Sequence, residues 1–231
     1  MILFGNPLNA SVRKVLCCAA LRSVELEQIS ILRGSDDPVF RAASPAGMIP
    51  ALRDGTRSII GSLPIIDYLD GFGAAEPIIS PDRETRVEFS SVAQFADGPL
   101  AQVVSPIFQN RVFLPRFLGK PGNMQLVNRL LRGPLNKIMA ATEIALSKVR
   151  GSDNIGIAEV SVFSQGLALL LSDQKIDSGS HPHIHKVMTR LLTDARLIPL
   201  ISRNARLVGL ELKAVTDLLG SEGWEVSKGS A

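Results

Sequence analysis

The sequence predicts a chain in two parts, a small α/β domain followed by a larger all-helical domain. Three observations support this prediction. Short apolar runs alternate with helical patterns in residues 2–69. Residues 71–81 are rich in Gly, Ala and Pro and show no periodicity. From Pro81 onward helical spacing recurs without a convincing strand pattern. We therefore expect domains at residues 1–72 and 84–231, joined by a linker at residues 73–83.

The pattern of the first part predicts the order strand, helix, strand, helix, two strands, helix. Ile2-Leu3-Phe4 is an apolar run that Gly-Asn-Pro ends, as expected of a buried strand. Apolar residues then recur at helical spacing at 11–21, and apolar and polar residues alternate at 26–32. Asp54-Gly55, between two strand-like runs, is a typical signal of a hairpin turn. The predicted elements after the first strand are a helix at 11–21, a strand at 26–32, a short helix that starts at 34–38, a hairpin at 50–60 and a helix at 62–69.

In the second part, apolar residues at helical spacing predict five helices. These are at residues 83–96, 123–150, 157–171, 183–195 and 207–219, and the second is interrupted or bent near Gly133-Pro134. Gly156 and Glu159 have the spacing of a capping box, in which the Glu side chain reaches back to the N-cap N–H. This pair predicts a helix N-terminus and has a role in folding rather than in chemistry.

Composition and charge exclude several classes of function. Hydrophobic residues make up 45% of the 231 residues and charged residues 20%, which is ordinary for a globular protein. The net charge is only +3 and Lys and Arg are scattered, which argues against nucleic-acid binding. No run approaches the roughly 18 apolar residues of a membrane helix, and the first residues lack the features of a signal peptide. We expect a soluble, cytoplasmic protein that binds neither nucleic acid nor a membrane.

The two cysteines are neighbours, Cys17 and Cys18. Adjacent residues of a helix point in different directions, so these two are poorly placed to form a disulfide with each other. They do not form a C-x-x-C redox motif either. We interpret them as small residues of an early helix, with at least one buried.

Several segments together resemble the cytosolic glutathione transferases. Residues 4–15 are similar to the family's first strand, catalytic loop and first helix. Residues 44–52 are similar to its Asn-Pro-x-Gly-Lys-Val-Pro-x-Leu segment, and residues 61–69 to its Glu-Ser-x-x-Ile-x-x-Tyr-Leu segment. Related residues also occur at 78–83, 156–159 and 181–182, so the resemblance extends along nearly the whole chain. It implies a thioredoxin-like first domain and an all-helical second domain.

The resemblance implies that Met48-Ile49-Pro50 and Ser62 bind glutathione. A cis proline at Pro50 would expose the backbone N–H and C=O of Ile49, which can pair with an extended peptide as an added strand does. Ser62 starts a helix, whose unpaired N–H groups and partial positive charge suit the γ-glutamyl carboxylate. The alternatives are a plain loop-to-strand proline and an ordinary N-cap serine.

Two positions depart from the family pattern. Gly61 stands where the family has Glu or Gln, which helps to anchor the γ-glutamyl group, and Met48 stands where Lys is common. A glycine offers only its backbone, so we expect either weaker glutathione binding or transfer of this task to another residue.

The catalytic position implied by the resemblance is Asn9, where most relatives have Ser, Cys or Tyr. The role is to donate a hydrogen bond to the glutathione sulfur and favour thiolate over thiol, which an amide N–H is able to do. Ser11 is the alternative donor, or else it caps the first helix. Arg13 and Lys14 are expected on an exposed face and in an interdomain contact, and a positive field near the sulfur is their alternative role.

The function implied is that of a glutathione S-transferase with a role in detoxification. Glutathione is the co-substrate, and its thiolate attacks a hydrophobic, electrophilic small molecule held between the domains. Candidate residues for that pocket are Phe95, Val103, Phe108 and Phe113. The family usually forms homodimers. A non-catalytic binding or regulatory protein of the same fold is the competing hypothesis, and peroxidase or β-etherase-like activity is a third.

The histidines of the segment 181–185 do not predict a metal site. His181, His183 and His185 alternate, but they lie at the start of a predicted helix and have no Cys or Glu close by in the sequence. We therefore expect no metal cofactor.

Overall fold

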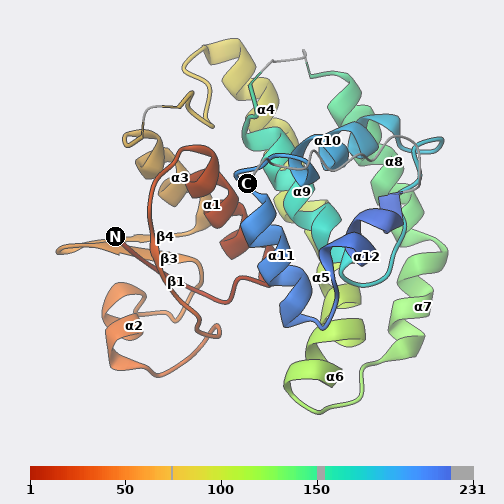
Figure 1. Cartoon of the computed structure of the whole chain (residues 1–231), viewed down its shortest axis with the longest axis horizontal. Helices are drawn as coiled ribbons and strands as arrows, with labels where there is room; N and C mark the ends of the chain where they lie inside the picture. The colour runs from red at the N-terminus through yellow and green to blue at the C-terminus, as the bar shows by residue number, and fades with distance from the viewer. Residues whose placement is uncertain (74, 150–153, 220–231) are drawn as a thin grey trace, which may run out of the picture.

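The computed structural model describes residues 1–73, 75–149 and 154–219, and its first part is built on a four-stranded sheet (Figure 1). The strands are β1 (Ile2–Phe4), β2 (Glu27–Ile29), β3 (Ala51–Asp54) and β4 (Arg57–Ile60). Their order in the sheet is β2-β1-β3-β4. β1 pairs parallel to β2 and antiparallel to β3, and β3 pairs antiparallel to β4. This mixed sheet confirms the predicted thioredoxin-like domain.

Helices cover both faces of the sheet. They are α1 (Ala10–Leu21), α2 (Pro38–Ala43) and α3 (Ser62–Asp70). Successive side chains of a strand point to opposite faces, so Leu3 belongs to the core formed with α1 and α3. The next residue, Phe4, packs instead with Phe40 of α2 in a smaller cluster.

The second part is helical, as predicted. Its elements are α4 (Arg83–Phe95), a π-helical turn η1 (Ala96–Leu100), α5 (Ala101–Phe108), a second π-helical turn η2 (Gln109–Phe113), α6 (Leu114–Phe117), α7 (Met124–Arg132), α8 (Pro134–Ser147), α9 (Ile157–Leu170), α10 (Pro182–Leu192), α11 (Ile198–Leu207), α12 (Leu212–Thr216) and the short 3₁₀ turn η3 (Asp217–Leu219). Within the described residues no strand follows β4, and no helix is long and apolar enough to cross a membrane.

The first helix of this part is longer than predicted. Gly98 and Pro99 interrupt the sequence pattern near residue 96, but the backbone continues through η1, which contains Pro99, into α5 and on to Phe117. A π-helical turn accommodates a residue without an N–H inside a helix. The helical stretch predicted at 123–150 is interrupted at Gly133, which confirms one of the two alternatives, and it consists of the helices α7 and α8. Its predicted end at residue 150 lies outside the described residues.

The predicted helix at residues 207–219 is confirmed only from Leu212 onward, as α12 and η3, and its predicted start is wrong. α11, which the sequence pattern did not predict, ends at Leu207, and Gly209 then adopts a φ of +70°. This left-handed conformation, which glycine adopts without steric cost, separates α11 from α12.

In the first part, β2 is shorter than the alternation at 26–32 indicates.

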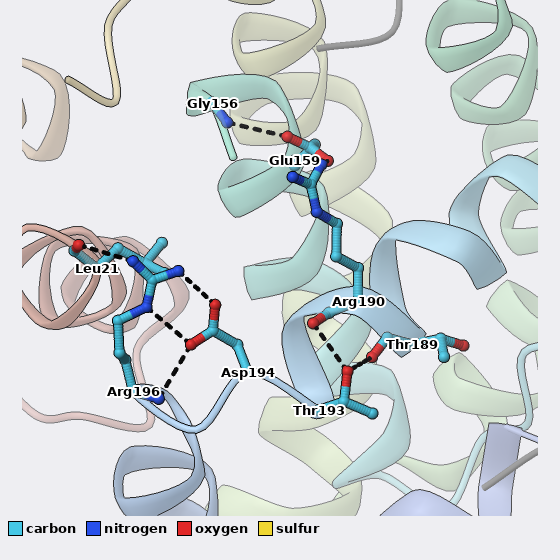
Figure 2. Close-up of polar contacts among 8 residues, drawn as sticks. All are labelled: Leu21, Gly156, Glu159, Thr189, Arg190, Thr193, Asp194 and Arg196. Atoms are coloured by element: carbon cyan, nitrogen blue, oxygen red, sulfur yellow. Dashed lines mark hydrogen bonds and ion pairs between the residues drawn. The ribbon is translucent and has the colours of Figure 1, made fainter. Parts of the chain in front are cut away.

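α9 is the centre of the helical part, because nearly all of its side chains are buried. Its N-terminus has the predicted cap: the Gly156 N–H donates to Oε2 of Glu159 at 2.9 Å (Figure 2). The other carboxylate oxygen, Oε1, accepts from Nη1 of Arg190 at 2.7 Å. One glutamate therefore ties the start of α9 to α10.

Buried cations of α1 join the two parts of the chain, so the expectation of an exposed face for Arg13 and Lys14 is wrong. Both side chains are almost completely buried, while their interdomain contact is confirmed. Arg13 donates to the Ser164 carbonyl of α9 at 2.6 Å, and Lys14 forms an ion pair with Asp97. At the end of α1, Arg196 donates to the Leu21 carbonyl at 3.2 Å (Figure 2).

Candidate functional site

A cleft of about 540 Å³ lies where the thioredoxin-like part meets the helical part. This volume is within the usual range for small-molecule sites. Its lining combines apolar side chains with several uncharged polar ones and one cation, Arg33. The residues are Asn6, Leu8, Asn9, Ala10, Leu32, Arg33 and Ile49 from the first part, and Ser105, Phe108, Gln109, Phe113, Gln165 and Ala168 from the second.

Asn9 caps α1 and leaves one end of its amide available. Its Oδ1 accepts from the backbone N–H groups of Ser11 at 3.0 Å and Val12 at 3.2 Å. The side chain is exposed, and its NH₂ group has no hydrogen-bond partner among the described residues. Asn9 therefore combines a structural acceptor with a free donor at the edge of the cleft. Ser11 is the second residue of the helix, so the alternative that Ser11 caps it is wrong.

Arg13 places a positive charge close to the start of α1. Its guanidinium donates to the carbonyl of Leu8 at 3.3 Å, directly before Asn9, and to Asn204 Oδ1 at 3.3 Å. These partners and the Ser164 carbonyl are neutral, and Arg13 has no ion pair within the described ranges. Burial lowers the pKa of Arg13 to about 10, so it stays protonated at neutral pH. Together with the N-terminus of α1, this charge favours an anion near Asn9.

The turn at Met48-Ile49-Pro50 presents free backbone groups to the cleft. The Ile49-Pro50 bond is cis, as expected. The Met48 backbone is held by Ser44: its N–H donates to Ser44 Oγ at 2.8 Å, and its carbonyl accepts from the same hydroxyl at 2.9 Å. The N–H and C=O of Ile49 form no hydrogen bond with any described residue. Ile49 thus has the unpaired donor and acceptor that an added strand needs.

The N-terminus of α3 lies next to this turn, because the Gly61 N–H donates to the Pro50 carbonyl at 3.0 Å. Gly61 is the N-cap, with a φ of +94°, and Ser62 is the first helical residue. The alternative of Ser62 as an N-cap serine is therefore wrong. No side chain caps this helix, so its first N–H groups are available to an anion.

The structure brings some of the predicted residues together and separates others. Asn9 and Ile49 line the cleft, and Pro50 connects Ile49 to Gly61 and Ser62. Of the four candidates for the electrophile pocket, Phe108 and Phe113 line the cleft, whereas Phe95 and Val103 do not. Sequence reasoning missed Gln165, Leu32 and Arg33. A signal for Gln165 was available, since it is the one carboxamide in the apolar pattern at 157–171.

The cysteines and histidines lie apart from this site. Cys17 and Cys18 are free thiols and fully buried, and burial raises the pKa of Cys17 to about 12. Nδ1 of His183 lies 2.6 Å from Glu143 Oε1, and Nε2 of His185 lies 2.8 Å from the Leu219 carbonyl. No three metal-ligating side chains cluster within the described residues.

The comparisons with known proteins point to one family. Residues 3–74 match the family model described as glutathione S-transferase, N-terminal domain. No curated protein matches the chain. A glutathione S-transferase from Sinorhizobium meliloti 1021 is similar in structure, with a TM-score of 0.78 and 19% identity over 94% of this chain and 98% of that one. A glutathione S-transferase from Rhodospirillum rubrum F11 has a TM-score of 0.74 and 16% identity over 86% and 90%.

A third similar structure is a maleylacetoacetate isomerase from Methylobacterium extorquens AM1 with bound malonate and glutathione. It has a TM-score of 0.66 and 22% identity over 87% of this chain and 95% of that one. The chain is thus a two-part protein with the glutathione S-transferase fold. Its residues 3–74 match the model of that family's N-terminal domain, and the resemblance to the cytosolic glutathione S-transferases seen in its sequence is confirmed.

Proposed function

We propose that the protein is a glutathione S-transferase, which activates the glutathione thiol and transfers it to a hydrophobic electrophile. The observation that supports this most is the composition of the cleft. One opening contains the free amide donor of Asn9, the unpaired backbone of Ile49, and the apolar side chains of Phe108 and Phe113. A peptide-like thiol and an apolar second substrate both find suitable partners there.

In this proposal, glutathione binds along the first domain. The backbone of its cysteinyl residue pairs with the N–H and C=O of Ile49, next to Met48 and Pro50. Its γ-glutamyl carboxylate accepts hydrogen bonds at the N-terminus of α3, from the region of Gly61 and Ser62. The Gly61–Pro50 hydrogen bond, 3.0 Å long, holds these two binding regions at a fixed separation.

The chemistry assigned to Asn9 is thiolate stabilisation. Its NH₂ group donates a hydrogen bond to the sulfur, while its Oδ1 keeps its two hydrogen bonds from the backbone of α1. The positive charge of Arg13 and the α1 N-terminus lower the thiol pKa in the same direction. The thiolate then attacks the electrophilic carbon, a carbon–sulfur bond forms, and a leaving group departs with the electron pair of its bond. Ser11 is the alternative donor, but it lies outside the cleft lining.

The experiment is an assay of glutathione-dependent turnover of 1-chloro-2,4-dinitrobenzene, accompanied by calorimetric titration of glutathione alone. We expect glutathione to bind and the aryl thioether to accumulate faster than in the uncatalysed reaction. Absence of binding at millimolar glutathione contradicts the enzyme proposal.

A non-catalytic binding protein of the same fold is the second candidate, and Gly61 is the observation that favours it. Glycine supplies no side chain to the γ-glutamyl group, so substrate positioning rests on backbone groups alone. Binding of glutathione without turnover, unaffected by Asn9→Ala, would identify this alternative.

The resemblance to the family also leads us to propose a homodimer in the cytoplasm with a role in detoxification. We also propose, from the same resemblance, that the first domain ends at residue 72 and that the second begins at residue 84. Apolar side chains exposed on β4, α3 and α4, among them Ile60, Leu63 and Val87, are consistent with a covered face. Light scattering of the purified protein gives its mass in solution and tests the dimer.

A further inference from the structure

The cleft contains a buried polar side chain whose hydrogen-bonding groups are unused. Gln165, on α9, is 3% exposed, and it lines the cleft. Its Oε1 is buried without a hydrogen-bond partner, and its NH₂ group forms no hydrogen bond with any described residue. Such a group is uncommon in a folded protein, because buried polar atoms are nearly always paired.

The neighbouring residues fix the position of Gln165. The Ser164 hydroxyl donates to the Ala10 carbonyl at 2.9 Å, which holds this part of α9 against the start of α1. Ala168, about one turn further along α9, lines the same cleft. Asn9 is exposed whereas Gln165 is almost completely buried, so Asn9 lies towards the opening and Gln165 at the floor.

We propose that Gln165 is a specificity-determining residue that hydrogen-bonds the polar end of the second substrate. This inference rests on the proposed function, and it adds the class of electrophile. A carboxamide offers N–H donors and a carbonyl acceptor, so a substrate carboxamide satisfies both ends of Gln165 at once. Electrophiles of this class place an apolar ring between Phe108 and Phe113, their carboxamide at Gln165, and their reactive carbon towards Asn9.

The physical reason for selectivity is the cost of leaving a buried polar group unpaired. A wholly apolar electrophile covers Gln165 without pairing it, whereas a carboxamide pairs it. A site built in this way discriminates between the two classes by about tenfold to a hundredfold.

The experiment compares 4-chloro-3-nitrobenzamide with 4-chloro-3-nitrobenzotrifluoride. They share the ring and the leaving group, and both para substituents withdraw electrons. We expect Gln165→Met, an unbranched apolar replacement, to lower kcat/KM for the benzamide by about tenfold or more, mainly through KM. The same change should raise kcat/KM for the trifluoride, because the apolar electrophile no longer covers an unpaired carboxamide. Gln109→Met is the matched control, because Gln109 lines the same cleft but is exposed to water. It should leave the preference unchanged.

Binding of the unreactive 3-nitrobenzamide, measured by calorimetry without glutathione, separates this inference from the proposed function. If the wild type binds it and Gln165→Met does not, the inference holds even when no turnover is seen, and only the enzyme proposal fails. Equal losses for both electrophiles, or equal binding of 3-nitrobenzamide by the two proteins, would overturn the role of Gln165.

Discussion

Replacing Asn9 by Asp separates its structural role from its proposed chemical role. Oδ1 of Asn9 accepts two backbone hydrogen bonds at the start of α1, at 3.0 and 3.2 Å. A carboxylate keeps both bonds, since Asp and Asn are equally good N-caps. It also adds a negative charge at a helix N-terminus, which stabilises by about 0.3–1 kcal/mol. The fold should therefore be retained, with a melting temperature no lower than that of the wild type.

The same change removes the only side-chain donor that Asn9 offers to the sulfur. A hydrogen bond to a charged group contributes about 1.5–3 kcal/mol, equivalent to a rise of about one to two units in the pKa of the bound thiol. The new negative charge acts in the same direction. At neutral pH the thiolate fraction, and with it kcat/KM, should fall by about tenfold or more.

The assay is the absorbance of the thiolate of bound glutathione, measured against pH, together with the turnover rate. Asn9→Ser is the matched control, because a hydroxyl both accepts from the helix and donates to sulfur. We expect Asn9→Ser to keep a lowered thiol pKa and Asn9→Asp to lose it. If Asn9→Asp retains the wild-type thiol pKa and rate, the reasoning on the amide donor is refuted.

Three further predictions concern binding, stability and thiol chemistry. Gly61→Ala and Gly61→Gln should each destabilise by about 1–3 kcal/mol in urea melts, because φ is +94° there, but only Gly61→Gln should bind glutathione more tightly; equal affinities would contradict this. Glu159→Ala should cost about 1–3 kcal/mol, because the Gly156 cap and the contact with Arg190 are both lost, and unchanged urea stability would argue against it. Burial raises the pKa of Cys17 from 9.0 to about 12, so dithionitrobenzoate should label it at neutral pH only after unfolding, and rapid labelling of the native protein would be inconsistent.

The same cysteine contributes to the pH dependence of stability at alkaline pH. In the unfolded chain the thiol ionises near its ordinary pKa, whereas in the native state it keeps its proton to about pH 12. Above pH 9 the native state therefore binds more protons than the unfolded state. Cys17 thus lowers stability as pH rises through this window, and its contribution is constant below it.

Much of the fold could be predicted from the sequence, because local patterns determine it. Period-two and period-3.6 patterns, Asp54-Gly55 and the Gly156–Glu159 box each act within a few residues. The helix boundaries that differ from the prediction depend on the backbone conformation of single residues. Pro99 is accommodated by a π-helical turn, and Gly209 ends α11 in a left-handed conformation. The pattern of apolar residues predicts neither the π-helical turn nor the left-handed conformation.

The candidate site was predictable only in part, for a different reason. Asn9 and Ile49 lie in motifs that keep their spacing, so their positions could be recognised in the sequence. Which side of α1 is buried depends on packing against α9. Arg13 is buried because the Ser164 carbonyl of α9 accepts its hydrogen bond from 151 residues away in sequence. Gln165 was missed because the cleft exists only once the two parts meet.

The central claim is that glutathione pairs with the free backbone of Ile49, beside the N-terminus of α3. Titration of the ¹⁵N-labelled protein with glutathione, followed by amide NMR, tests it most directly. We predict saturable shifts of the amide signals of Ile49 and Ser62, and slower hydrogen exchange at Ile49 as its N–H becomes paired. Unchanged signals at millimolar glutathione, or shifts confined to residues far from the cleft, would contradict the account.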